Sequence, residues 1–186
     1  MTAPRCVLMV GLPGSGKTYL AKALESAGML RICPDEEMWR RHGHYGRDFP
    51  RGQYLVRERP VLDDLAVDLT AALAQGRSVV FDHGLWTPAE RTEWRERTTA
   101  AGGKPLLVYL PADHDVLWSR LQTRNRDTFD DPNAMLLTEA DLLRFAGRFY
   151  PPGQDEPHLV YDGQPQSVLS ALASRTPSAS ASPGDD

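Results

Sequence analysis

The sequence predicts an α/β fold, in which one parallel sheet carries helices on both of its faces. Short apolar runs, typical of buried strands, alternate along the chain with stretches whose apolar residues recur at helical spacing. Parallel strands need long crossover connections, usually helices, so this alternation favours a sheet between two helical layers. A glycine-rich segment between the first strand and the first helix also fills every fixed position of the pattern G-x-x-x-x-G-K-[ST].

The composition bounds the kind of protein. A chain of 186 residues is long enough for one domain with a sizeable core. A formal net charge of -4 gives no overall attraction to nucleic acid, so we expect a small-molecule partner, although a local basic groove stays possible. The chain has two cysteines without metal-ligand spacing, no run of membrane-spanning length and no signal-peptide pattern. We therefore expect a cytoplasmic protein with no membrane partner, as a monomer or homodimer.

The glycine-rich segment at residues 11–18 predicts a phosphate-binding loop. Glycines allow successive backbone N–H groups to turn toward phosphate oxygens, and the following helix adds partial positive charge from its N-terminus. Lys17 is expected to reach the β- and γ-phosphates of ATP, and the Thr18 hydroxyl to bind Mg²⁺. The predicted nucleotide-binding residues of the loop are Gly11, Pro13, Gly14, Ser15, Gly16, Lys17 and Thr18.

The other elements follow from periodicity and from stop signals. In the first half we predict strands at 6–10, 30–33 and 78–82, and helices at 19–24, 36–39 and 55–73. Pro60 lies inside the last of these helices, so it either kinks the helix or marks a start at Val61. The glycine-interrupted segment at 40–47 is rich in basic and aromatic residues, and we predict a loop over the site.

The second half continues the alternation. We predict strands at 105–110 and 158–161 and helices at 87–102, 113–126, 138–149 and 167–173. Thr87, Pro88 and Glu90 form a helix start with a capping box. Residues 1–173 are expected to form one domain, with a mobile lid at about 125–137 and a disordered tail at 174–186.

Two aspartates follow strands at the edge of the sheet where the phosphate loop lies. A phosphoryl transfer to an alcohol needs a carboxylate that orients the hydroxyl and accepts its proton, and Asp35 can do this. Asp35 can equally well be the N-cap of the helix that follows, and the two roles are compatible. Asp82 ends an apolar strand, where we expect it to hold Mg²⁺ together with Thr18; the alternative is a turn residue.

Further candidates lie in the loops and at the start of the lid. Trp39, Tyr45, His83 and Trp86 are expected to line an acceptor pocket, although His83 can also be a structural histidine. Arg120, Arg124 and Arg126 end a helix that leads into the lid, where arginines can neutralise the transferring phosphoryl group when the lid closes. Of these three, Arg124 and Arg126 are the predicted catalytic residues, because they lie nearer the lid. Arg120 and Arg124 are predicted to bind the nucleotide. The alternative is that all three stabilise a helix C-terminus.

Four motifs together resemble a known family. They are G-x-P-G-S-G-K-T in the loop, P-D after the second strand, V-V-F-D-H-G at the third strand and R-L-Q-x-R-N-R before the lid. They are similar to the small AAA-type P-loop kinases related to zeta toxin, chloramphenicol phosphotransferase and the kinase domain of phage polynucleotide kinase, over about residues 5–162. The resemblance implies a three-layer P-loop NTPase fold whose five-stranded parallel sheet has the order 2-3-1-4-5. It also implies that Asp35 is the base and that arginines at 120–126 bind phosphates.

The resemblance implies an ATP-dependent kinase, with ATP and Mg²⁺ as cofactors. Its acceptor would be a hydroxyl of a small molecule such as an antibiotic, a nucleoside or a sugar-like compound. The chain lacks the D-E pair of ring-forming AAA+ machines after the third strand, which argues against remodelling driven by hydrolysis. A polynucleotide 5'-hydroxyl kinase is an alternative that would use the arginines Arg40, Arg41, Arg47, Arg51 and Arg57. Another is a nucleotide-binding regulatory module without its own acceptor.

Overall fold

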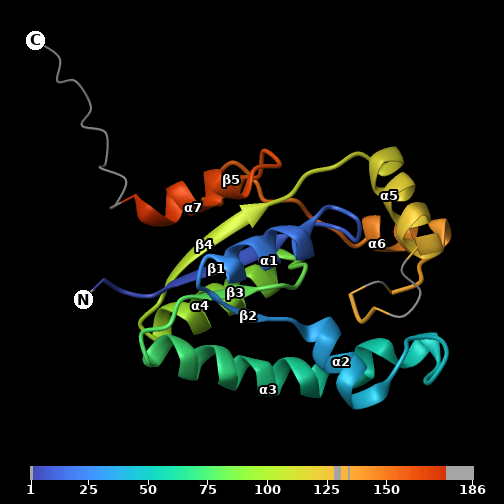
Figure 1. Ribbon diagram of the computed structural model, residues 1–186, viewed down its shortest axis with the longest axis horizontal. Coiled ribbons are helices and arrows are strands. Elements are labelled where there is room, and N and C mark those ends of the chain that lie inside the picture. The colour runs from blue at the N-terminus through green and yellow to red at the C-terminus, as the bar shows by residue number, and fades with distance from the viewer. Residues whose placement is uncertain (1, 128–130, 134, 175–186) are drawn as a thin grey trace, which may run out of the picture.

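Five parallel strands form the centre of the molecule in a computed structural model that describes residues 2–127, 131–133 and 135–174 (Figure 1). Their order across the sheet is β2-β3-β1-β4-β5, which confirms the predicted order. The strands are β1 at Arg5–Val10, β2 at Leu30–Ile32, β3 at Val79–Phe81, β4 at Lys104–Tyr109 and β5 at Leu159–Val160. This is the sheet of a P-loop NTPase fold.

The pairing register brings the carboxyl ends of three strands to one edge. In the centre, β1 pairs with β3 from Cys6 opposite Val79 to Leu8 opposite Phe81. The other neighbour of β3 is β2, whose Ile32 lies opposite Phe81. The segments that follow β1, β2 and β3 therefore start side by side, and these segments contain the phosphate loop, Asp35 and Asp82.

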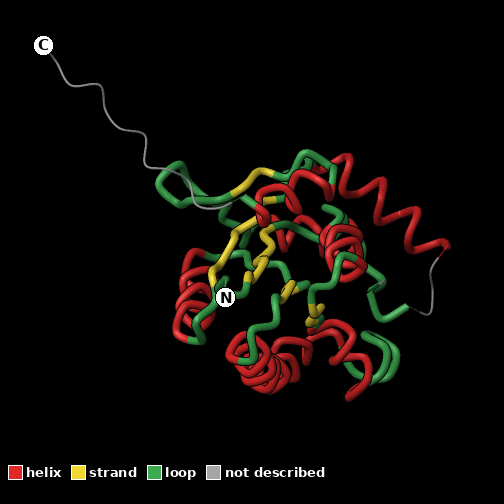
Figure 2. The backbone as a smooth tube through the Cα atoms, turned by 60° about the vertical axis from the view of Figure 1, so that its left-hand side comes forward, coloured by secondary structure: helices red, strands yellow, loops and turns green. Residues whose placement is uncertain are grey.

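Helices cover both faces of the sheet (Figure 2). One core joins the sheet to α1 at Lys17–Ser26 and α7 at Pro165–Ala173, and the other joins it to α3 at Tyr54–Ala74 and α4 at Pro88–Ala100. The remaining helices are α2 at Pro34–His42, η1 at Arg51–Gln53, α5 at His114–Asp127 and α6 at Glu139–Ala146. In Figure 1, α2, α5 and α6 lie beyond the carboxyl ends of the strands, so they surround the edge where the loops begin.

The start of α2 corrects one expectation. This helix begins at Pro34, and its N-cap is Cys33, so Asp35 lies inside the first turn instead of capping it. Proline suits the first helical position because the missing N–H would have no partner there. The helix also runs on to His42, so residues 40–42 are helical and not part of the predicted loop.

The long helix α3 at Tyr54–Ala74 corrects the expectation about Pro60. It begins at Tyr54 and continues through Pro60, so the alternative start at Val61 is wrong. A proline removes the hydrogen bond to the carbonyl four residues earlier, here that of Val56. Val56 is 76% exposed, so this turn of the helix faces solvent. The capping box of α4 at Thr87 and Glu90 is present as predicted.

The predicted lid and tail fall partly outside the described residues. The structure does not describe residues 128–130 and 134 of the predicted lid, or residues 175–186 of the predicted tail. Ser174 is described and is the C-cap of α7. In the described ranges, every helix is too short or too polar to cross a bilayer.

Candidate active site

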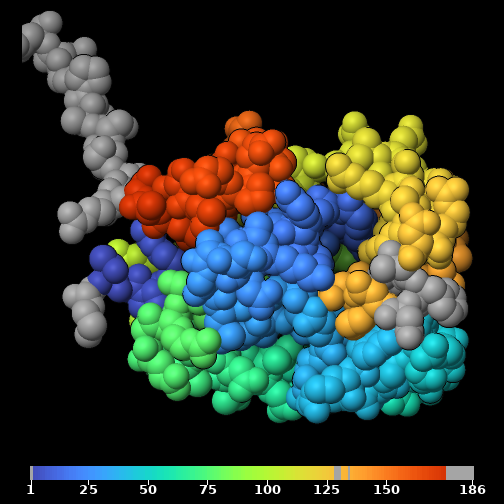
Figure 3. Space-filling view, viewed as in Figure 1, coloured from blue at the N-terminus to red at the C-terminus, as the bar shows by residue number. Residues whose placement is uncertain are grey.

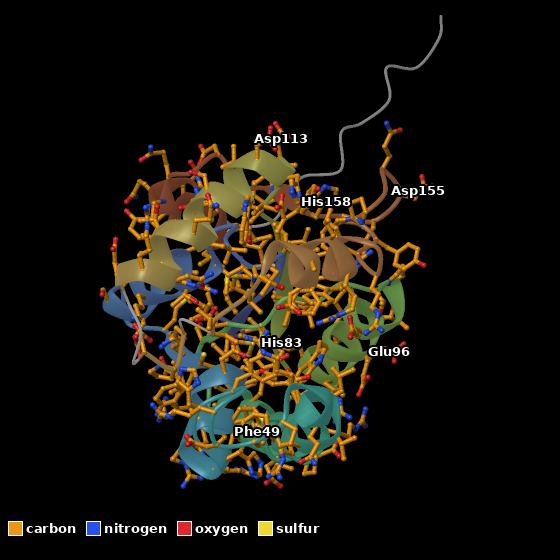
Figure 4. All side chains as sticks on the ribbon, turned by 90° about the vertical axis from the view of Figure 1, so that its right-hand side faces the viewer. Phe49, His83, Glu96, Asp113, Asp155 and His158 are labelled. Atoms are coloured by element: carbon orange, nitrogen blue, oxygen red, sulfur yellow. The ribbon has the colours of Figure 1, made fainter. Side chains whose placement is uncertain are left out.

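A cavity of about 660 Å³ lies at the carboxyl ends of the strands. Its walls come from the phosphate loop, the start of α2, the loop after β3, and helices α3, α5 and α6. In Figure 3, the orange segment before α6 lies between α5 and the α2 region. Figure 4 shows His83 in the middle of this end of the molecule, between α6 and the α2–α3 region. The cavity is large enough for a nucleotide-sized ligand.

The phosphate loop forms one wall. Gly14 and Gly16 adopt φ angles of 85° and 99°, a region that other residues rarely adopt, and this conformation leads into the first turn of α1. Lys17 Nζ donates hydrogen bonds to the carbonyls of Gly11 at 3.0 Å and Leu12 at 2.9 Å. Burial lowers the pKa of Lys17 to about 8, opposed by the charge of Asp82. The ammonium group thus stays mostly charged at neutral pH, as phosphate binding requires.

Thr18 and Asp82 form a pair of oxygen ligands beside Lys17. Thr18 Oγ1 donates to Asp82 Oδ1 at 3.4 Å, and both residues line the cavity. Hydroxyl and carboxylate oxygens are donors that Mg²⁺ prefers, so this pair fits the predicted metal site. Burial raises the pKa of Asp82, while Arg31 lowers it.

Arg31 is a site residue that the sequence interpretation missed. Its Nη2 donates to Asp82 Oδ2 at 2.7 Å, and its Nη1 donates to Glu36 Oε1, also at 2.7 Å. This arrangement leaves Asp82 Oδ1 on the Thr18 side. A charged residue inside the strand Leu30–Ile32 needs a buried partner, which is the signal that could have identified it.

Asp35 lies in the first turn of α2 and lines the same cavity. The Tyr54 hydroxyl, in the first turn of α3, donates to Asp35 Oδ1 at 2.7 Å. Asp35 lines the cavity and contributes to the electrostatic field at Lys17. The structure therefore brings the predicted base and the phosphate loop to one cavity. The hydrogen bond from Tyr54 fixes the position of the Asp35 carboxylate.

A second carboxyl group accompanies Asp35. Glu58 is 8% exposed, lines the cavity, and lies one helical turn after Tyr54. Burial raises the pKa of Glu58 to about 8, and the charges of Asp35 and Glu90 add to this shift. Glu58 is therefore mostly protonated at neutral pH. Sequence reasoning missed it, although it shares the buried face of α3 with Val61 and Leu65.

Aromatic side chains line the rest of this wall. Of the predicted acceptor residues, Tyr45, His83 and Trp86 line the cavity. The Trp86 ring lies 5.1 Å from that of Phe145 on α6, and Trp86 Nε1 donates to the Gly11 carbonyl at 3.3 Å. Burial lowers the pKa of His83 to about 4, so its imidazole is neutral at pH 7.

Trp39 lies elsewhere. It packs against His44, with 5.1 Å between ring centroids, and is not among the described residues that line the cavity. Its place on α2 turns the ring toward the loop that follows the helix, so the structure does not bring Trp39 to the acceptor wall.

Two of the three arginines at the end of α5 reach the cavity. Arg124 Nη2 donates to the Met135 carbonyl at 2.7 Å, and its buried Nε has no partner among the described residues. Arg120 Nη1 donates to the Gly14 carbonyl at 3.1 Å. Arg126 is exposed and outside the described lining, because residues two apart on a helix point in nearly opposite directions. The structure therefore brings Arg120 and Arg124 to the cavity, and it does not bring Arg126 there.

Gly11 and Ser15 belong to the phosphate loop but are buried. Neither is among the described residues that line the cavity, although the Gly11 carbonyl accepts hydrogen bonds from Lys17 and Trp86. Ser15 is buried, and its hydroxyl has no partner among the described residues. Pro13, Gly14, Gly16, Lys17 and Thr18 line the cavity.

Comparison with known proteins gives a family and a fold. A family model described as an AAA domain matches residues 6–152. No curated protein sequence matches the chain significantly.

Solved structures with this fold include three kinases by their descriptions. A proposed kinase from Chloroflexus aurantiacus superposes with a TM-score of 0.72 at 19% identity, covering 92% of this chain and 97% of that one. A gluconokinase from Sinorhizobium meliloti gives 0.57 at 16% identity, covering 91% and 90%. The Mycobacterium tuberculosis APS kinase in complex with AMPPNP and APS gives 0.59 at 18%, covering 94% and 100%. At these identities the likeness shows the fold alone.

Proposed function

The chain belongs to the AAA domain family, and we propose on this basis that it is an ATP-dependent kinase that phosphorylates a hydroxyl group of a small molecule. One observation carries the proposal: Lys17 of the phosphate loop and Asp35, held by Tyr54, line the same cavity. A phosphate-binding loop by itself indicates nucleotide binding. A positioned carboxylate in the same cavity adds the group that a transfer to an alcohol needs.

The residues divide the reaction between two sides of the cavity. The loop backbone and Lys17 would hold the phosphates of ATP, and Arg120 and Arg124 would approach them from α5. Thr18 and Asp82 would hold Mg²⁺, which neutralises charge on the β- and γ-phosphates. We call these residues the donor side.

The acceptor side consists of Asp35, Tyr45, Tyr54, Glu58, His83, Trp86 and Phe145. Here Asp35 would accept the proton of the acceptor hydroxyl. The acceptor oxygen then bonds to the γ-phosphorus, and the bond from that phosphorus to the β–γ bridging oxygen breaks. The Tyr54 hydroxyl keeps the Asp35 carboxylate in place, and the aromatic rings exclude water from the reacting groups.

The gluconokinase, the APS kinase and a sugar kinase from Janibacter are similar in fold, which supports a small-molecule acceptor. The arginine cluster expected for a polynucleotide kinase does not favour that alternative. Arg41 pairs with Glu37 and Asp64, Arg40 pairs with Glu37, and only Arg51 of the five is among the described residues that line the cavity. The other four arginines therefore lie outside the described lining of the cavity in which the transfer would take place.

Incubation of the protein with γ-labelled ATP and a metabolite extract tests the proposal. We expect label in at least one new phosphomonoester, which mass spectrometry identifies, and no such product from Asp35→Asn. The variant keeps an oxygen that can accept from Tyr54, so its melting temperature should match the wild type. ATP loss that is equally slow with and without the extract would instead favour the regulatory module.

A further inference from the structure

Three arginines line the cavity without belonging to the phosphate-binding machinery described above. They are Arg51 in η1, Arg144 on α6 and Arg148 just after α6. Lys17, Lys22, Arg120 and Arg124 already line the donor side and, with Mg²⁺, can meet the charge of ATP. Three further cations in one cavity are more than the nucleotide requires.

Asp141 holds two of these arginines side by side. Its Oδ2 accepts from Arg51 Nη1 at 2.9 Å, and its Oδ1 accepts from Arg144 Nη2 at 2.7 Å. Oδ2 also accepts from the Thr138 backbone and hydroxyl. One buried carboxylate thus fixes two guanidinium groups but balances a single positive charge.

Arg148 adds a third positive charge to this group. It lines the cavity, and no ion pair or side-chain hydrogen bond is found for it in the described part of the chain. It lies beside the acceptor side, since Phe145 contacts the Trp86 ring and the Tyr150 N–H donates to the Trp86 carbonyl. Arg51 also belongs there, with its guanidinium 5.3 Å from the centre of the Tyr45 ring.

The acidic residues of the acceptor side offset little of this charge. Glu58 is mostly protonated at neutral pH because burial raises its pKa. Glu90 Oε2 accepts hydrogen bonds from the Trp86 and Thr87 backbone, in the capping box of α4. Asp35 is assigned to the acceptor hydroxyl, and Asp141 balances one of the three arginine charges, so the arginine group keeps excess positive charge toward the bound acceptor.

We propose that the acceptor carries an oxyanion, either a carboxylate or a phosphate, in addition to the hydroxyl that is phosphorylated, and that Arg144, Arg148 and Arg51 bind this oxyanion. The inference rests on the proposed function, because it names the class of acceptor used at that site. Guanidinium groups suit carboxylate and phosphate equally well, since both offer two oxygens to paired N–H donors.

A binding experiment that needs no turnover tests the anion site. The protein is saturated with Mg²⁺ and AMPPNP, which occupies the phosphate loop, and calorimetry then measures binding of methyl phosphate in one arm and acetate in the other. We expect at least one probe to bind, with an affinity that falls about tenfold or more in Arg148→Gln. Arg59→Gln is the matched control, because Arg59 is exposed on α3 and pairs with Asp63. Absence of binding by both probes, or equal binding by Arg148→Gln, overturns the proposal.

A transfer experiment identifies the acceptor class. The metabolite extract is divided by anion exchange, and each fraction is incubated with labelled ATP. We expect labelled product from the retained, anionic fraction alone, reduced at least tenfold by Arg148→Gln. Product from the unretained fraction alone overturns the anionic acceptor and leaves the kinase standing. No product from either fraction overturns the kinase, whereas the probe experiment decides the anion site independently.

Discussion

The donor side and the acceptor side of the cavity are built in different ways. The donor side depends mainly on one continuous segment, residues 11–18, whose backbone conformation is set by its own glycines. The acceptor side combines residues from α2, α3, the loop after β3 and α6, more than 100 positions apart in the sequence. A local motif can therefore be kept while the surrounding helices present a different acceptor wall, which is how one fold serves many kinases.

The two sides also differ in how burial acts on their titratable groups. Lys17 on the donor side has its pKa lowered to about 8 and remains mostly charged at pH 7. On the acceptor side, Glu58 has a pKa raised to about 8, and His83 has one lowered to about 4, so both are neutral at that pH. Burial therefore leaves a charged lysine on the donor side, whereas it neutralises Glu58 and His83 on the acceptor side.

The largest effect is expected on the donor side, from Lys17→Ala. This change removes the cation of the phosphate loop, so transfer should be abolished and the ATP dissociation constant should rise about 10- to 100-fold. Calorimetry with ATP measures it. Lys104→Ala, an exposed change at the other end of β4, should leave ATP affinity at the wild-type value. Unchanged affinity in Lys17→Ala would show that the nucleotide binds elsewhere.

On the acceptor side, Asp35→Asn should lower kcat by about 10²–10⁴ because the proton acceptor is lost. ATP affinity should stay near normal, since the phosphate loop and Lys17 are unchanged in this variant. Steady-state rates on the identified acceptor, together with ATP titration, separate the two quantities. A folded, ATP-binding variant with undiminished turnover would refute the base and leave Asp82 or His83 to be examined.

Arg124→Ala tests whether an arginine of α5 assists the transfer between the donor side and the acceptor side. The buried Nε of this arginine has no partner among the described residues, so a phosphate oxygen is its natural acceptor. We expect kcat to fall by roughly 10² and ATP affinity to change less, because such a group acts mainly on charge that develops during transfer.

Arg126→Ala completes this comparison. It should have a smaller effect than Arg124→Ala, since Arg126 is exposed on another face of α5. Equal losses in the two variants would mean that the helix end rearranges when the site closes.

The smallest effect is on stability and concerns Glu58. A carboxyl group with a raised pKa in the folded state stabilises that state at low pH and loses this contribution as pH rises toward its folded pKa. His83 and Lys17, whose pKa values are lowered in the folded state, have the opposite trend, and both are present in Glu58→Gln, so the difference between the wild type and this variant from pH 6.5 to 8 isolates Glu58. Over that window the unfolding free energy of the wild type should fall by about 1–2 kcal/mol relative to that of Glu58→Gln.

Glu58→Gln should lack that fall, because an amide does not titrate. Denaturant unfolding of both proteins at several pH values measures the difference. Parallel curves for the two proteins would show that Glu58 titrates normally, and the electrostatic contrast between the two sides would lose its main support.

The sequence by itself determined the alternation of strands and helices and the place of the phosphate loop between the first strand and the first helix. Alternating strands and helices, together with the capping box at Thr87, depend on local periodicity and hydrogen bonding within a few residues. The positions of Lys17 and Thr18 likewise follow from a motif whose geometry is local. The five-stranded order came from the resemblance and is confirmed by the pairing of the strands.

Only the tertiary structure decided the acceptor side. The pairing of Tyr54 with Asp35, the burial of Glu58 and the choice of Arg120 over Arg126 depend on how α2, α3 and α5 pack around the edge of the sheet. The same holds for Arg51 and Arg144, which are 93 residues apart by number and meet at Asp141. Contacts between distant segments depend on how the whole core packs, so the pattern within one segment cannot predict them.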